Sequence, residues 1–288
     1  MVQAISAYKL DDTGRDLELA APRWRLPRSA GRYALGGLLP LGLLGLWAVA
    51  AGRAWAPPQI LPPPRLVLST LVDLAISGEL LNNYLISLGR VAAGFFVGAL
   101  LGALLGGAMG LSRRVEQYLF PTFNALSQVP VLGWLPLAMM LFGIGESLKV
   151  VIIAQACLVP VAINVLGGIR RVPAQYLEVA RVFELTRFQL LRRVVLPAAV
   201  PSLFVGVRYG LTLGWLSLVT VELLASSEGL GFLIVWGRQL FQLDLVLAAI
   251  ISVGVVGLLL DKGLALLESR LLRWRPQASW GASKAVSS

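Results

Sequence analysis

The residues of this chain that could do chemistry are concentrated in one charged segment between long apolar runs. Residues 178–197 (EVARVFELTRFQLLRRVVLP) hold two glutamates and four arginines among apolar residues at helical spacing. This pattern predicts one or two short amphipathic helices that lie in water and end at Pro197. Such a segment favours the docking of a soluble partner over catalysis.

Residue types that most catalytic and metal sites need are missing from the chain. It has no histidine, and Cys157 is its single cysteine, inside an apolar run. This excludes disulfides within the chain and histidine-dependent triads, and it argues against a His/Cys metal site. We therefore expect no catalytic residue and no metal, with Cys157 as inert packing.

The composition indicates an all-α integral membrane protein. The 288 residues are 57% hydrophobic and 14% charged, with a mean hydropathy of +0.77. Their apolar runs are longer than a globular core helix needs. The net charge of +10 could serve nucleic acid, but the arginines are split among short segments and do not form a basic face with aromatics. We expect contact with membrane lipid and no nucleic acid.

Six apolar runs are long enough to predict transmembrane helices. They are residues 33–51, 91–111, 118–142, 148–166, 203–224 and 245–267. A proline-rich connector follows the first run, and residues 66–80 predict a short helix outside the bilayer. The predicted division is an N-terminal cytoplasmic tail (1–32), a first span with its outer connector (33–80), a transmembrane domain (81–275) and a C-terminal cytoplasmic tail (276–288).

The basic residues predict the orientation of these six spans. Eighteen lysines and arginines fall on the side of residues 178–197, and five fall on the opposite side. Cytoplasmic segments carry the excess of Lys and Arg. The charged segment and both termini are therefore predicted to be cytoplasmic.

Two spans carry glycine at every fourth residue. The stripes are Gly94, Gly98, Gly102, Gly106 and Gly110 in the second span, and Gly206, Gly210 and Gly214 in the fifth. Glycines at this spacing share one helical face. Small residues let helix backbones approach closely in lipid, so both faces are predicted to pack against other helices.

The third run is interrupted by prolines and is predicted to bend or break between residues 128 and 136. Broken helices survive at membrane depth where they are buried or line a cavity. We therefore predict that six residues of the third and fifth spans line a translocation pathway: Gln128, Pro130, Gly133, Trp134, Ser217 and Thr220.

Charged residues within spans are costly and usually functional or paired. Arg90, at the outer end of the second span, either snorkels to the surface or meets an anionic solute. Arg208 is expected to contact Asp261 or a lipid phosphate. Pairing of Arg208 with Glu222 is not expected, because they lie 14 residues apart.

The charged segment resembles the cytoplasmic EAA loop of ABC transporter permeases through Glu178, Val179, Ala180 and the pair Leu196–Pro197. LPAAVPSLFVGVRYGLTLGW (196–215) and VELLASSEGLGFLI (221–234) then follow it in order. Residues 81–275 thus resemble a type I ABC importer permease, most like the branch serving sulfonates, taurine and nitrate. The resemblance implies a pathway for a small solute in a bacterial inner membrane.

The resemblance also implies partners. A second permease copy, expected as a homodimer, would assemble with two ABC ATPase subunits and a periplasmic substrate-binding protein. No GxxxxGK[ST] motif occurs and no lysine follows a glycine. ATP and Mg are therefore expected on the ATPase, with no cofactor and no enzymatic activity in this chain.

In the family this loop forms a coupling helix. The resemblance assigns contact with the ATPase to Glu178, Val179, Ala180, Phe183, Glu184, Leu196 and Pro197. An apolar face is expected to enter a groove on the ATPase through Leu177, Val182, Phe183 and Phe188, while Glu178 pairs with a basic residue there. Glu184 stands where the family has glycine, which favours one continuous helix in place of a turn.

Other functions stay open on the sequence. A permease for bicarbonate or a vitamin precursor is the alternative of the same class. A stand-alone secondary transporter or channel would normally show inverted repeats or several intramembrane acids. A membrane enzyme would need His, Cys or paired carboxylates within the spans. For residues 178–197 the alternative is an interfacial helix held by arginines on anionic lipid.

Overall fold

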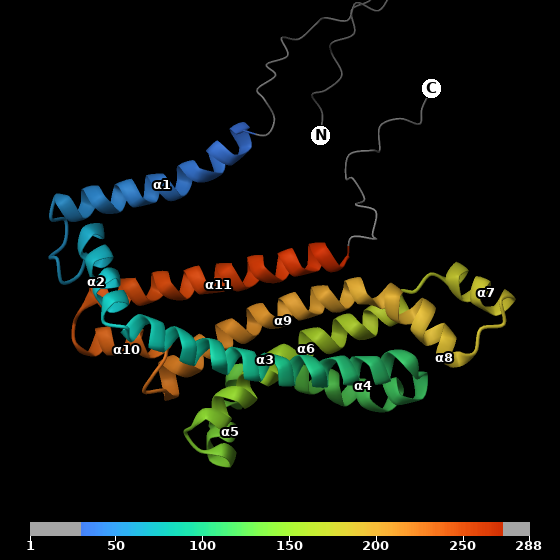
Figure 1. Cartoon of the computed structure of the whole chain (residues 1–288). Helices are drawn as coiled ribbons and strands as arrows, with labels where there is room; N and C mark the ends of the chain where they lie inside the picture. The colour runs from blue at the N-terminus through green and yellow to red at the C-terminus, as the bar shows by residue number, and fades with distance from the viewer. Residues whose placement is uncertain (1–29, 273–288) are drawn as a thin grey trace, which may run out of the picture. The chain divides into compact units, whose positions relative to one another are not determined.

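The computed structural model describes residues 30–272, with side chains described from residue 38 onward. All regular secondary structure in this range is helical, as the composition predicted. The described chain divides into two compact units, with the boundary between residues 56 and 57. Figure 1 shows the described helices of each unit. Residues 1–29 and 276–288 of the two predicted tails lie outside the described residues.

The first unit contains helix α1, Ala30–Gly52, at the position of the first predicted span. Its end is a Schellman-type turn in which Ala54 has a φ of 52° and the Trp55 N–H donates to the Ala50 carbonyl at 3.1 Å. The described apolar part of α1, Leu38–Gly52, is shorter than the helices of the second unit that could cross a membrane.

The second unit contains the remaining described helices. They are α2 (Pro64–Ile76), α3 (Glu79–Leu111), α4 (Arg113–Ser127), the 3₁₀ helix η1 (Val131–Trp134), α5 (Leu135–Phe142), α6 (Glu146–Arg170), α7 (Ala174–Val182), α8 (Arg187–Leu190), the π-helical turn η2 (Leu191–Val195), α9 (Leu196–Ala225), α10 (Leu230–Gln239) and α11 (Leu243–Leu271).

Four helical runs of the described residues are long and apolar enough to cross a membrane: α3, α6, the run 187–239 around α9, and α11. A fifth is reached if α4 and the η1–α5 segment, which meet at 89°, form one bent span. The predicted number of six therefore requires α1 as well. The predicted break in the third span is present, because α4 ends at Ser127 and Pro130 precedes η1.

The predicted start of the second span, residue 91, is wrong. Helix α3 begins twelve residues earlier, at Glu79. The apolar run is interrupted there by Asn83, Ser87 and Arg90, so hydropathy alone places the start of the span too late in the chain. These polar side chains are buried and bonded to other helices, which removes the cost of placing them in the bundle.

Helix α6 lies between α3 and α9 and makes the most extensive helix contacts of the unit (Figure 1). Its side chains at Leu148, Ile152, Cys157 and Val161 are fully buried. Both glycine stripes face it. A Cβ at Gly94, Gly98, Gly102, Gly106 or Gly110 would collide with α6, as would one at Gly206 or Gly214, and one at Gly210 would crowd it.

The α3–α6 contact is a backbone contact at its centre. A Cβ at Gly98 would overlap the carbonyl oxygen of Ala154, and one at Gly106 would overlap that of Ala162. On the other side of α6, the Cys157 thiol donates to the Gly210 carbonyl of α9 at 3.2 Å. Cys157 is thus a packing residue, fully buried between helices.

We predict that Gly106→Ala destabilises the folded protein by about 1–3 kcal/mol, because the added methyl group has no space against α6. The matched control is Gly107→Ala on the same helix, where a Cβ would meet nothing within 4 Å. Thermal unfolding of the purified protein in detergent measures both. Equal melting temperatures for the two variants would contradict the close α3–α6 packing.

Candidate functional site

The charged segment begins immediately after α6. Three residues, 171–173, separate α6 from α7, and Pro173 caps the start of α7. Helix α7 lies between two helical runs that could cross a membrane, 146–170 and 187–239, and belongs to neither. Figure 1 shows α7 and α8 together at the end of the bundle where α6 finishes and α9 starts.

A tight turn ends α7, so of the one or two helices that the sequence left open for this segment the structure has two. Glu184 has a φ of 48°, in the left-handed region that favours glycine. Its N–H donates to the Arg181 carbonyl at 3.0 Å, and the Leu185 N–H donates to the Ala180 carbonyl at 3.0 Å. These two bonds form a Schellman motif, with glutamate at the position that glycine usually occupies.

The chain re-enters a helix directly after this turn. Thr186 caps α8 through a capping box with Gln189, in which each side chain accepts from the other residue's backbone N–H. From Arg187 the backbone is helical without interruption through α8, η2 and α9. The prediction that Pro197 closes the segment is therefore wrong.

Pro197 lies instead in the first turn of α9. Proline has no N–H to bond the fourth residue back, and its ring clashes with that carbonyl in a regular α-helix. The π-helical turn η2 directly precedes it and widens the backbone at this point. The segment from Thr186 is thus an extension of α9 rather than a separate surface helix.

The apolar face of this segment differs in part from the predicted one. Val182, Phe183 and Phe188 are exposed, by 81%, 73% and 69%, whereas Leu177 is half-buried. Tyr176 and Val179 are exposed in its place. The spacing of positions 176, 179, 182 and 183, three or four residues apart, is the sequence signal that identifies this face.

Ala180, the small residue of the EAA-like motif, has a structural role in the turn after α7. Ala180 is 4% exposed and its carbonyl accepts the Leu185 N–H. Glu178 and Val179, two residues and one residue before it, are exposed. Leu196 and Pro197 are also exposed, at the start of α9. The segment therefore presents an apolar and acidic outer face over a packed turn.

The predicted pathway residues are split between two places. Gln128, Pro130 and Gly133 are exposed at the bend between α4 and α5. Trp134 is half-buried against an apolar cluster that includes Leu148 of α6 and Val221 of α9. Ser217 and Thr220 are half-buried on α9, where the Thr220 hydroxyl donates to the Leu216 carbonyl at 2.9 Å.

A buried polar cluster joins α3, α6 and α9 at the opposite end of the bundle from α7. Arg90 is 6% exposed and does not snorkel. Its Nε and Nη2 donate to the Glu146 carboxylate at 2.7 and 2.6 Å, and its Nη1 donates to Glu222 at 2.8 Å. Lys149, 5% exposed, donates to Glu146 at 2.7 Å.

The same cluster holds the first turn of α10, whose N–H groups have no partner within the helix. The N–H of Gly231 donates to Glu222 at 2.9 Å, that of Leu230 to Ser87 at 3.0 Å, and that of Gly229 to Asn83 at 2.7 Å. Gly229 has a φ of 107°, and a Cβ there would overlap the Glu222 carboxylate. Glycine is therefore required at this position.

Sequence reasoning missed most of this cluster because its members are far apart in the chain. One signal was present. Asn83, Ser87 and Arg90 continue the face of the glycine stripe toward the start of α3, at spacings of three and four residues. A face that packs tightly against helices and carries polar groups requires buried partners for them.

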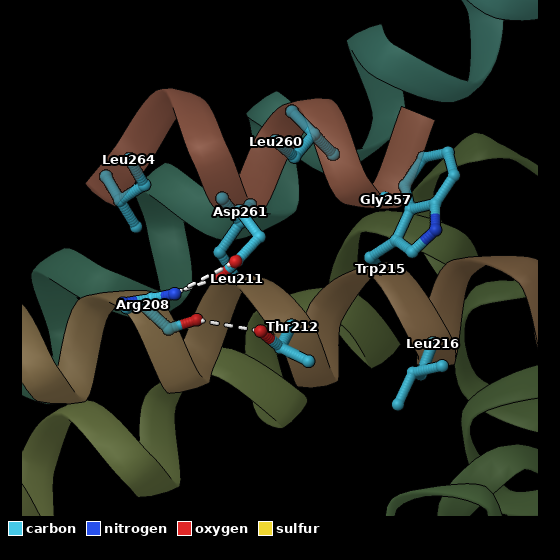
Figure 2. A pocket seen from close by; sticks show the side chains of 9 residues that line it. All are labelled: Arg208, Leu211, Thr212, Trp215, Leu216, Gly257, Leu260, Asp261 and Leu264. Atoms are coloured by element: carbon cyan, nitrogen blue, oxygen red, sulfur yellow. Dashed lines mark hydrogen bonds and ion pairs between the residues drawn. The ribbon is translucent and has the colours of Figure 1, made fainter. Parts of the chain in front are cut away.

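Of the two partners expected for Arg208, Asp261 or a lipid phosphate, the structure shows Asp261. Arg208 of α9 donates from Nε and Nη2 to the two carboxylate oxygens of Asp261 of α11, at 2.7 and 2.9 Å (Figure 2). The pair lies beside a largely apolar cavity of about 220 Å³ that also contains Trp215 and Gly257. Both side chains are more than 40% exposed, so this bidentate pair is far less buried than that of Arg90.

Within residues 30–272, His, Cys, Asp and Glu form no group of three or more that could hold a metal ion. The structure therefore has an exposed apolar face on α7 at one end of the bundle and a charged, hydrogen-bonded cluster at the other.

Comparison with known proteins places these features in a family context. Residues 98–273 match the family described as binding-protein-dependent transport system inner membrane component. A protein of Bacillus subtilis named as an aliphatic sulfonates transport permease, SsuC, is 40% identical over 275 residues, which cover 96% of this chain and 98% of that protein. The taurine transport system permease TauC of Escherichia coli is 36% identical, with coverage of 88% and 93%.

The fold is also similar to that of a solved structure, an amino acid ABC transporter crystallised with histidines. The TM-score is 0.59 at 18% identity, and the match covers 69% of this chain and 97% of that chain. At this identity the likeness concerns the helical arrangement.

We predict that Glu184→Gly stabilises the turn after α7 by about 1 kcal/mol, because glycine adopts the left-handed conformation without steric cost. The Leu185 amide should then exchange its hydrogen about fivefold more slowly. Glu184→Val, whose branched side chain is poorly tolerated at positive φ, should accelerate it. Hydrogen exchange followed over residues 178–190 measures the effect, and faster exchange in the glycine variant would contradict it.

Proposed function

This chain belongs to the family of binding-protein-dependent transport system inner membrane components, and on that premise we propose that it is the permease of an ATP-driven importer for a small anionic solute of the aliphatic sulfonate type. It is a multi-pass protein of the inner membrane and a transport component rather than an enzyme. The solute class rests on the near full-length similarity to permeases named for aliphatic sulfonates and taurine.

The observation that carries this proposal is the outer face of α7. Tyr176, Val179, Val182 and Phe183 are more than half exposed on a segment outside the candidate spans. A contiguous apolar face in water marks a site of protein interaction. In our proposal this face of α7 binds in a groove on the ATPase subunit, where Glu178 pairs with a basic residue of that subunit.

The connections of α7 make it suitable for transmitting motion. It is linked to α6 by three residues and to α9 by the Schellman turn and the helical run from Arg187. Helices α6 and α9 in turn pack on each other through Gly206, Gly210 and Gly214. A displacement of α7 by the closing ATPase would therefore move two packed helices together and could switch access across the membrane.

The basic residues support a cytoplasmic position for α7. Six arginines lie in or beside the segment: Arg170, Arg171, Arg181, Arg187, Arg192 and Arg193. Cytoplasmic segments of membrane proteins are enriched in such residues. With six spans, we propose that both termini are cytoplasmic and that the Arg90 cluster lies toward the extracytoplasmic side.

The assembly that we propose contains two copies of this permease, two ATPase subunits and one extracytoplasmic binding protein. The exposed bend at Gln128, Pro130 and Gly133 supports a second copy or a water-filled pathway at this place. Non-helical backbone at membrane depth is stable only against protein or water. Trp134, Ser217 and Thr220 would line the same pathway.

The proposal predicts that Glu178→Arg abolishes solute-stimulated ATP hydrolysis without preventing membrane insertion, because it places a like charge against the basic residue of the ATPase. The complex is reconstituted in vesicles with the binding protein, and ATP hydrolysis is measured with and without an aliphatic sulfonate. The matched control is Asp73→Arg, a charge reversal at an exposed acid of α2.

Unchanged coupling in Glu178→Arg would contradict the role assigned to α7. The solute class has its own test: thermal-shift screening of the partner binding protein against sulfonates, nitrate, bicarbonate and vitamin precursors. Stabilisation by nitrate or bicarbonate and not by sulfonates would contradict that part of the proposal.

A further inference from the structure

The buried part of the Arg90 cluster carries an excess positive charge. Arg90, Lys149 and Glu222 have side chains that are 5%, 6% and 0% exposed. These three contribute two positive charges and one negative charge. Among the described residues, the second positive charge is paired with Glu146, whose side chain is 63% exposed.

The two carboxylates of the cluster are held very differently. Glu222 accepts from Ser87, Arg90 and the Gly231 N–H, so it is fixed by α3 and by the start of α10. Glu146 accepts from the two buried cations: its Oε1 from Arg90 and Lys149, and its Oε2 from Arg90. Each of these contacts could be made equally by another oxyanion.

The geometry at Glu146 suits a sulfonate group. The guanidinium of Arg90 presents Nε and Nη2 side by side, which matches two oxygens of a carboxylate or of another oxyanion. The Lys149 ammonium lies on the Oε1 side and has further protons to donate. A sulfonate has three acceptor oxygens, enough to satisfy both cations.

A depression of about 420 Å³ opens beside Arg90 and Glu146, and the Lys149 ammonium reaches it through its contact with Glu146. Its walls are mainly small or aliphatic, and a Cβ at Gly89 would meet nothing within 4 Å. They comprise Leu85, Ile86, Gly89, Ala93 and Val150, with Arg90, Glu146 and Glu228 as the charged members. Its volume is in the range of small-ligand sites, and it is an open depression rather than an enclosed cavity. The exposed Glu146 carboxylate also requires this face to meet water or protein, not hydrocarbon.

We propose that Arg90 and Lys149 form an anion site within the permease, which Glu146 fills in the empty transporter and yields to the sulfonate group of the solute. The inference rests on the proposed function and adds to it a solute-binding site in this chain. The exchange of one oxyanion for another leaves the buried charge balanced throughout. The short aliphatic part of the solute would lie against Ile86, Gly89 and Ala93.

The test uses the permease–ATPase complex in lipid nanodiscs without the binding protein, with ethanesulfonate as the probe. Glu146→Gln removes the competing carboxylate and should raise the affinity for ethanesulfonate by about tenfold. Lys149→Gln should lower it below that of the unmodified complex. Calorimetric titration at constant ionic strength measures both, and ethyl methyl sulfone serves as the uncharged probe that should not bind.

The matched control is Asp261→Asn, which frees Arg208 from its own bidentate partner at a partly exposed site. It should leave the affinity unchanged. An equal gain in this variant would reveal general attraction of anions, and no gain in Glu146→Gln would show that Glu146 serves only as a structural ion-pair partner. Either result overturns the site.

The Lys149→Gln arm keeps the proposal testable if Glu146→Gln does not assemble, since an unchanged affinity in that variant also overturns it. The proposed function is tested separately by uptake with the unmodified complex and the binding protein. If Arg90 and Lys149 bind no anion and the complex still takes up a sulfonate with ATP, the proposed function stands and this inference alone is rejected.

Discussion

Close packing of α6 between two glycine-faced helices is the interaction on which the rest of the structure depends. Burial of apolar surface between helices gains little in lipid, so association requires close van der Waals contact and hydrogen bonds. Gly98 and Gly106 allow the α3 backbone to reach carbonyl groups of α6, and Gly206 and Gly214 let α9 pack closely against the Asn164 and Cys157 side chains of α6. This core fixes three helices as one unit.

Both functional regions are built at the ends of this three-helix unit. At one end, α7 carries an exposed apolar face and is joined to α6 by three residues and to the helical run of α9 by the turn at Glu184. At the other end, Arg90, Glu146 and Glu222 bridge the same three helices by charge-assisted hydrogen bonds. An event at either end is therefore connected to the other through packed helices, without a separate pathway of flexible residues.

Local patterns predicted the features that depend on neighbouring residues in the chain. The four-residue glycine spacing identified the packing faces of α3 and α9, and Pro130 identified the break. The start of α3 was missed because the residues that satisfy Ser87 and Arg90, chiefly Glu222, lie more than 130 positions away. The effect of Glu184 on the turn stayed open for a related reason: the bonds of the Schellman turn and the cap at Thr186, which outweigh its side-chain preference, depend on the folded backbone.

The central claim is that the exposed face of α7 contacts the ATPase while the opposite face packs on the permease. Site-specific cross-linking tests it most directly, because Cys157 is buried and a cysteine introduced on α7 would be the accessible thiol among residues 38–272. Val182→Cys, at an 81% exposed position, should cross-link to the ATPase subunit in membranes, and Leu177→Cys, at a half-buried position of the same helix, should not. Cross-linking of Leu177→Cys alone, or of neither variant, would contradict the account.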